Sequence, residues 1–195
     1  MRVSKINRET KETQIELGLD LDGQGKADID TGIGFIDHML TLFAFHGDFD
    51  LVAKCKGDLV VDSHHTVEDL GIVLGSAFKE ALGQKLGIIR YGSFSVVMDE
   101  ALVTTNLDIS GRPFLVYNAK VEVSQLGNYD TEMTEEFFRA FVNQAGITLH
   151  INKGYGKNTH HIIEAIFKSV ARALKIAVAI DETKKEVVSS SKGVL

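Results

Sequence analysis

A short polar string occurs twice and constrains this chain more than any other feature. The copies are His64-His65-Thr66-Val67-Glu68 and, ninety-six residues later, His160-His161-Ile162-Ile163-Glu164. Each copy precedes apolar residues at helical spacing, which predicts that each begins a helix. Because residues i and i+4 share a helix face, the first His and the Glu of each copy can bind one ion, while the second His turns toward another.

The two paired motifs predict two metal sites. A single motif of this kind is more often a polar helix start with solvated histidines, but the repetition of the Glu at the same offset favours metal binding. Imidazole and carboxylate ligands suit manganese, iron, cobalt, nickel or zinc. Cys55 is the only cysteine, which excludes an internal disulfide and a thiolate-rich zinc site.

The composition indicates an ordered globular protein. Of 195 residues, 44% are hydrophobic and only one is proline, which is enough to build a buried core. The net charge of −6 lacks the basic excess that nucleic-acid binding requires. The N-terminus has no apolar signal segment, and no run of eighteen apolar residues occurs. We therefore expect a soluble cytoplasmic protein with no nucleic-acid or membrane partner.

Periodicity predicts an α+β chain built as an internal duplication. The first half-repeat, residues 1–90, is expected to contain a β-hairpin over 10–31, a helix at 35–46, a strand at 49–57, and a helix from residue 64 capped by Asp62-Ser63. The second, residues 91–195, is expected to contain strands near 93–98, 102–110 and 113–123, a helix at 132–145, a strand at 147–152, and a helix capped by Thr159. Together they would form one compact domain with a C-terminal tail.

Some residues near the motifs allow more than one interpretation. Glu12 is by default an exposed strand carboxylate. Gly71 and Gly75, four apart inside a helix, predict that another backbone packs closely there. Several aspartates could orient ligand imidazoles, although each is equally explained as a helix cap or a solvated charge. These aspartates are Asp37, Asp62, Asp69 and Asp99.

The paired motifs occur with other distinctive strings. These are Thr31-Gly32-Ile33-Gly34-Phe35-Ile36-Asp37-His38-Met39-Leu40, Met98-Asp99-Glu100-Ala101-Leu102, Gly111-Arg112-Pro113-Phe114 and Tyr155-Gly156-Lys157-Asn158-Thr159. Together they resemble the imidazoleglycerol-phosphate dehydratase family of histidine biosynthesis, from about residue 5 to the C-terminus. The resemblance implies two similar halves, each a four-stranded β-sheet with helices packed on one face. It also implies two Mn²⁺ ions per subunit, at subunit interfaces of a 24-subunit homo-oligomer.

The resemblance also implies a role for each matching position. Glu12 matches the catalytic carboxylate. The metal ligands would be His38, His64, His65, Glu68, His150, His160, His161 and Glu164. The substrate phosphate would be held by Arg90, Arg112, Lys168, Ser190 and Lys192. The last two belong to a tail that composition alone describes as a flexible end. The tail also lacks a proline that is usual in the family, which should make it looser.

The implied reaction is a dehydration of imidazole glycerol phosphate to imidazole acetol phosphate and water. In the implied route, a metal-bound imidazolate expels the hydroxyl to give a diazafulvene, and Glu12 removes the neighbouring proton. Two alternatives remain open. A histidine-rich metal-storage or metal-delivery protein would not need Glu12 or the phosphate-binding cations, and a dinuclear metal phosphoesterase would release phosphate. Retention of phosphate on the product would separate the three.

Overall fold

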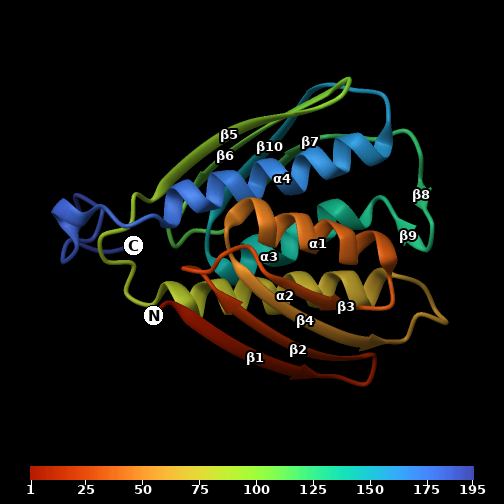
Figure 1. The fold of residues 1–195 in the computed structure, drawn as a ribbon, viewed down its shortest axis with the longest axis horizontal. Helices are drawn as coiled ribbons and strands as arrows, with labels where there is room; N and C mark the ends of the chain where they lie inside the picture. The colour runs from red at the N-terminus through yellow and green to blue at the C-terminus, as the bar shows by residue number, and fades with distance from the viewer.

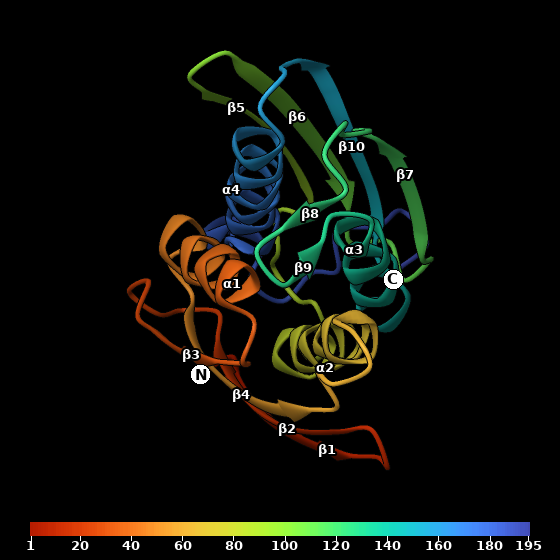
Figure 2. The same ribbon diagram turned by 90° about the vertical axis from the view of Figure 1, so that its right-hand side faces the viewer.

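Two four-stranded sheets enclose a layer of four helices (Figure 1, Figure 2). The structure is a computed structural model that describes residues 1–195. One sheet comes from the first part of the chain and the other from the second, and the helices lie between them. Each sheet therefore has its helices on one face, as expected, and its other face is open.

The two halves contain corresponding elements in the same order. The first comprises β1 (Val3–Glu9), β2 (Thr13–Asp20), β3 (Ala27–Asp30), α1 (Gly34–Gly47), β4 (Asp50–Gly57) and α2 (His64–Leu82). The second comprises β5 (Tyr91–Met98), β6 (Ala101–Asp108), β7 (Phe114–Asn118), β8 (Gln125–Leu126), β9 (Tyr129–Asp130), α3 (Met133–Ala145), β10 (Thr148–Tyr155) and α4 (Thr159–Val178). A short 3₁₀ helix, η1 (Glu182–Lys184), follows.

Sheet topology confirms the internal duplication. The strand orders are β1-β2-β4-β3 and β5-β6-β10-β7, so each strand of one sheet has a counterpart in the other. In both sheets the last pair is parallel, β3 with β4 and β7 with β10, and the other pairs are antiparallel. Only the second half carries an insertion, the small β8–β9 hairpin before α3.

The hairpin predicted over residues 10–31 is wrong. β2 pairs with β1 and β4, whereas β3 pairs with the far edge of β4. The intervening loop is held to the start of β4, because Asp50 Oδ1 accepts the backbone N–H groups of Gln24 (2.8 Å) and Lys26 (2.9 Å). The strand β1 was not predicted, because its sequence is mostly polar and has little apolar periodicity. The strand predicted at 113–123 ends earlier, at Asn118.

The helix caps also differ from expectation. Asn158, not Thr159, caps α4, and its side chain accepts the backbone N–H groups of His160 (2.9 Å) and His161 (3.3 Å). Ser63 precedes α2 but makes no cap hydrogen bond; Asp62 Oδ1 accepts the His64 N–H at 2.8 Å instead. Both paired motifs nevertheless lie in the first turn of a helix, as predicted.

The hydrophobic core lies in the helical layer and joins the two halves. α2 packs on α3 and α1 packs on α4, so each helix pair combines the two halves. A Cβ atom at Gly71 would lie 2.5 Å from the Phe137 carbonyl oxygen, and one at Gly75 would lie 2.5 Å from that of Phe141. The close backbone approach predicted at these glycines is therefore confirmed. No helix is both long enough and apolar enough to cross a membrane.

Candidate metal centre

The helices of both halves begin at the same end of the molecule (Figure 1). This follows from the duplication, because both sheets run in the same sense along the helical layer. It places the first two turns of α1, which include His38, beside the first turns of α4. Which helices are neighbours could not be predicted from the sequence.

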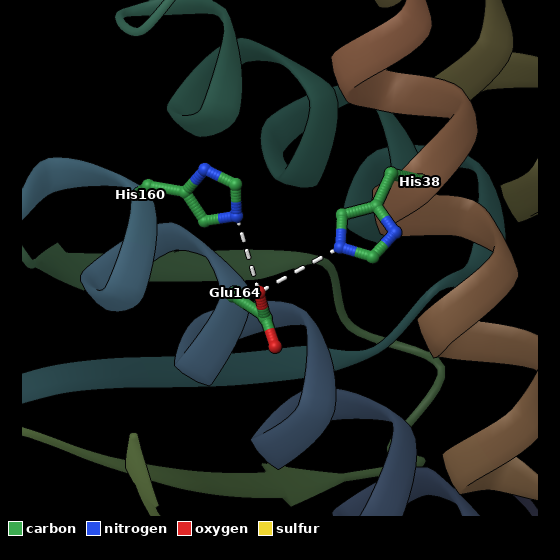
Figure 3. Close-up of side chains that lie close together, drawn as sticks. All are labelled: His38, His160 and Glu164. Carbon is green, nitrogen blue, oxygen red and sulfur yellow. Dashed lines mark hydrogen bonds and ion pairs between the residues drawn. The ribbon is translucent and has the colours of Figure 1, made fainter. Parts of the chain in front are cut away.

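His38, His160 and Glu164 form one group of candidate metal ligands (Figure 3). Their ligand atoms all lie within 4.8 Å of one another. Glu164 Oε2 is 3.2 Å from His160 Nε2 and 3.7 Å from His38 Nε2. Two imidazole nitrogens and a carboxylate oxygen pointing at one another are a donor set suited to a divalent transition metal.

Glu164 is held in an ionised state at this site. Its side chain is only 8% exposed, and Lys168 Nζ donates to its other oxygen, Oε1. Burial acts to raise the pKa of Glu164, but the ion pair with Lys168, together with His38 and His160, holds that pKa below its ordinary value. The buried carboxylate is therefore negatively charged and can bind a cation.

The first-half motif has fewer donors around it. His64 Nε2 lies 3.6 Å from Glu68 Oε2, as the i,i+4 spacing predicts. No third His, Cys, Asp or Glu joins them in a group of the kind found at Glu164. Both side chains are nearly half exposed, so this pair lies at the surface of the single chain.

The second histidine of each motif is held by a carboxylate that was not predicted. His65 Nδ1 is 3.0 Å from Asp58 Oδ2, and His161 Nδ1 is 2.8 Å from Glu100 Oε2. The hydrogen bond from His161 and the backbone N–H groups of Asn158 and Lys157 lower the pKa of Glu100 to about 2. In both histidines Nε2 is left free of a hydrogen bond.

None of the four aspartates proposed to orient the histidines does so by a hydrogen bond. Asp37 accepts from Thr31, and Asp69 pairs with Arg8 and Thr13. Asp62 caps α2, and Asp99 comes only within 3.8 Å of His161 Nε2. Asp62 and Asp99 thus match the alternatives that the sequence left open, a helix cap and a solvated charge. Asp37 and the buried Asp69 match neither, because other side chains hold them.

Glu12 lies in the turn between β1 and β2, near the first-half motif. Its Oε1 atom is 3.8 Å from His65 Nε2, and its side chain is 53% exposed. No hydrogen bond holds the carboxylate; only the backbone N–H of Glu12 is bonded, to Thr10 Oγ1. The structure therefore brings together two residues that lie fifty-three positions apart in the chain.

His150 lies away from the His38 group in the single chain. The neighbouring Leu149 and Ile151 are buried against the helices, so His150 points to the open face of the second sheet. That face is polar, with hydrogen bonds between Ser95 and Thr104 and between neighbouring asparagines.

The candidate phosphate ligands divide into two groups. Arg90 donates to Asp108 (2.7 Å) and to the Ser189 carbonyl (2.8 Å), and Arg112 Nη2 is 3.9 Å from Asp108. The tail folds back beside them, since Gly87 N–H donates to the Val187 carbonyl at 3.0 Å. Ser190 and Lys192 follow in this tail, whereas Lys168 is with Glu164.

The Arg90 group and the candidate metal ligands lie at opposite ends of α4. Arg90 N–H donates to the carbonyl of Ala177, near the end of the helix, whereas His160 is in its first turn. At 1.5 Å per residue these positions are about 25 Å apart. A small substrate cannot span that distance within one chain.

A duplicated α+β fold with a His/Glu group of candidate metal ligands at its helix starts defines a class of candidate metalloenzyme, and comparison with known proteins identifies the family. The family model for imidazoleglycerol-phosphate dehydratase matches residues 31–174. The chain therefore belongs to the imidazoleglycerol-phosphate dehydratase family and is an enzyme, a hydro-lyase.

Individual relatives are similar over the whole chain. The imidazoleglycerol-phosphate dehydratase of Lactococcus lactis subsp. cremoris strain SK11 is 66% identical, covering 100% of this chain and 98% of its own length. The imidazoleglycerol-phosphate dehydratase of Clostridioides difficile strain 630 is 56% identical, covering 100% of this chain and 100% of its own length.

Two solved structures share the fold. The crystal structure of the Staphylococcus aureus imidazoleglycerol-phosphate dehydratase has a TM-score of 0.84 at 43% identity, covering 92% of this chain and 99% of the other. The Pyrococcus furiosus enzyme, in complex with (S)-C348, has a TM-score of 0.84 at 36% identity, covering 97% and 100%.

Proposed function

We propose that this enzyme removes water from imidazole glycerol phosphate to give imidazole acetol phosphate in histidine biosynthesis, and that it depends on two Mn²⁺ ions per subunit. The observation that carries the metal dependence is the convergence of His38, His160 and Glu164 within 4.8 Å. We further propose a cytoplasmic location, and half-repeats that meet between Arg90 and Tyr91, where β5 begins.

Eight residues would hold the ions. They are His38, His64, His65, Glu68, His150, His160, His161 and Glu164. When bound, the ions would supply Lewis acidity to the imidazole ring of the substrate. The donor chemistry fits such an ion, because every donor is an imidazole nitrogen or a carboxylate oxygen.

Glu12 is proposed as the general base. A base must be free to approach the proton that it removes, and the Glu12 carboxylate is exposed and bears no hydrogen bond. It would take the proton from the carbon next to the one that loses the hydroxyl. Water and the new carbon–carbon double bond result, and the enol then relaxes to the ketone.

The phosphate would be held by Arg90, Arg112, Lys168, Ser190 and Lys192. Arginine can bind phosphate through two parallel hydrogen bonds. Since Arg90 and His160 lie about 25 Å apart in one chain, we propose that Arg90 of one subunit holds the phosphate of a substrate whose imidazole lies at the metal ligands of another subunit. This separation, and the position of His150 on an open sheet face, support active sites between subunits of a 24-subunit homo-oligomer.

A chelation cycle tests the proposal. Purified enzyme is stripped of metal, assayed for dehydration, and assayed again after Mn²⁺ is added. We expect activity to disappear and return, with phosphate retained on the product. Light scattering on the same samples should show smaller folded oligomers without metal, because binding that exists only in the assembly stabilises the assembly. Release of phosphate would indicate a phosphoesterase, and metal binding without turnover would indicate a storage protein.

A further inference from the structure

An internal repeat relates Glu12 to Glu100. The string Leu19-Asp20-Leu21-Asp22-Gly23 at the end of β2 corresponds to Leu107-Asp108-Ile109-Ser110-Gly111 at the end of β6. Glu12 and Glu100 each lie seven residues before the first leucine of their string. Each is in the turn just before its strand. Each also lies beside the second histidine of a paired motif.

The two equivalent carboxylates have different surroundings. Glu100 Oε1 accepts the backbone N–H groups of Lys157 (3.1 Å) and Asn158 (2.7 Å), and its Oε2 faces His161 Nδ1 at 2.8 Å. Glu12 has no such anchors and approaches His65 on the Nε2 side, at 3.8 Å. Glu100 is therefore fixed between a loop and a histidine, and Glu12 is free.

Asp58 has in the first half the contact that Glu100 has in the second. It comes from the loop between β4 and α2, so it is not the repeat counterpart of Glu100. Its Oδ2 lies 3.0 Å from His65 Nδ1, while its Oδ1 is buried and has no hydrogen-bond partner. His65 is thus the one polar partner of this side chain.

We propose that Asp58 and Glu100 are matched positioning residues, each of which keeps the proton of its histidine on Nδ1 and so presents Nε2, unprotonated, to the metal. A carboxylate that accepts from one ring nitrogen fixes both the tautomer and the orientation of the ring. This inference rests on the proposed metal-dependent function. It also explains why Glu12 is available as a base: in the first half the orienting contact belongs to Asp58.

Measurement of Mn²⁺ affinity on the metal-stripped full-length protein tests the proposal without any substrate. In Glu100→Gln, the amide nitrogen must face either the two backbone donors or His161, and either arrangement breaks a contact or reverses the tautomer. We expect a 10- to 100-fold loss of affinity for the affected ions, the range for partners of metal ligands. Asp58→Ala should give a similar loss.

Conservative and control variants separate positioning from general damage. Asp58→Asn should remain close to wild type, because its amide oxygen can still accept from His65 Nδ1. Glu9→Gln, which neutralises an exposed carboxylate at the end of β1, should have no effect. Glu100→Asp keeps the charge but is too short to join both contacts, so it provides a second test if Glu100→Gln folds poorly by circular dichroism.

Two results would overturn the proposal. One is Mn²⁺ affinity within twofold of wild type in both Glu100→Gln and Asp58→Ala. The other is an equal loss in Asp58→Asn and Asp58→Ala, which would show that charge matters and hydrogen-bond acceptance does not. Failure of the proposed function is distinguishable, because it would appear as wild-type protein that binds Mn²⁺ normally and does not dehydrate the substrate.

Discussion

The paired motif of the second half lies in a group of three donors, whereas the same motif in the first half has two. The difference comes from the neighbouring helix. α1 contributes His38 to the start of α4. His38 lies ten residues before Asp48, the left-handed residue that ends α1. The residue ten positions before Gly146, which ends α3 in the same conformation, is Glu136. Glu136 pairs with Arg139 (3.7 Å) instead. A repeated motif therefore does not by itself repeat a site.

The largest expected effect contrasts Glu12 with its repeat counterpart Glu100. Glu12→Gln should lower kcat by roughly two to four orders of magnitude, the usual range for losing a general base, and leave the Mn²⁺ content unchanged. Steady-state kinetics combined with metal analysis would check this. A near-normal kcat would remove Glu12 from the proposed chemistry and leave the two carboxylates undifferentiated.

The next contrast is between His38 and Glu136, which have equivalent positions in α1 and α3. His38→Ala removes one of three converging donors and should weaken Mn²⁺ binding by at least roughly tenfold, whereas Glu136→Ala should not change it. Titration of metal-stripped protein in competition with a coloured chelator measures both. An equal loss in the two variants would show that the three-donor asymmetry does not persist in the working enzyme.

The helix pairs provide a third contrast. Gly71 and Gly75 let α2 approach the backbone of α3, whereas the equivalent positions in α4 are Phe167 and Ala171. Gly71→Ala should lower the free energy of unfolding, because an overpacking cost of about 1–3 kcal/mol exceeds a helix-propensity gain of at most about 1 kcal/mol. Denaturant titration measures the change. Gly34→Ala, where a Cβ meets nothing within 4 Å, is the control.

The smallest expected effect concerns Lys168, which follows Glu164 by four residues in α4. The equivalent residue in α2, four after Glu68, is the uncharged Ile72. Lys168→Met removes the ion pair that holds Glu164 Oε1, so Mn²⁺ affinity should fall a few-fold. KM should also rise if Lys168 binds phosphate. Lys175→Met, further along the same helix, is the matched control. A larger loss than in His38→Ala would contradict this order of importance.

The sequence predicted the duplication, most elements and the approximate bounds of α1 and α3, because apolar periodicity and glycine positions are local signals. It did not predict which strands pair. The failed hairpin at residues 10–31 shows this, since Asp50 directs the loop to another strand through hydrogen bonds that no pattern reveals.

The histidines and Glu164 could be named from the sequence, but their grouping could not. His38 joins His160 only because α1 packs on α4, and this is a property of tertiary packing. Asp58 and Glu100 were missed for different reasons. Aligning the two halves would have found Glu100 from its match to Glu12. It would not have found Asp58, because the equivalent loop between β10 and α4 contains no acidic residue.

The packing of helices across the halves has a consequence for the origin of the chain. In each helix pair one member comes from each half, so a polypeptide of half this length would leave the apolar side of its helices uncovered. Two such polypeptides would cover one another as a symmetric dimer. Fusion of their genes would convert that encounter into an intramolecular one, at an effective concentration of order millimolar. Once fused, the copies could diverge, as the surroundings of Glu12 and Glu100 have done.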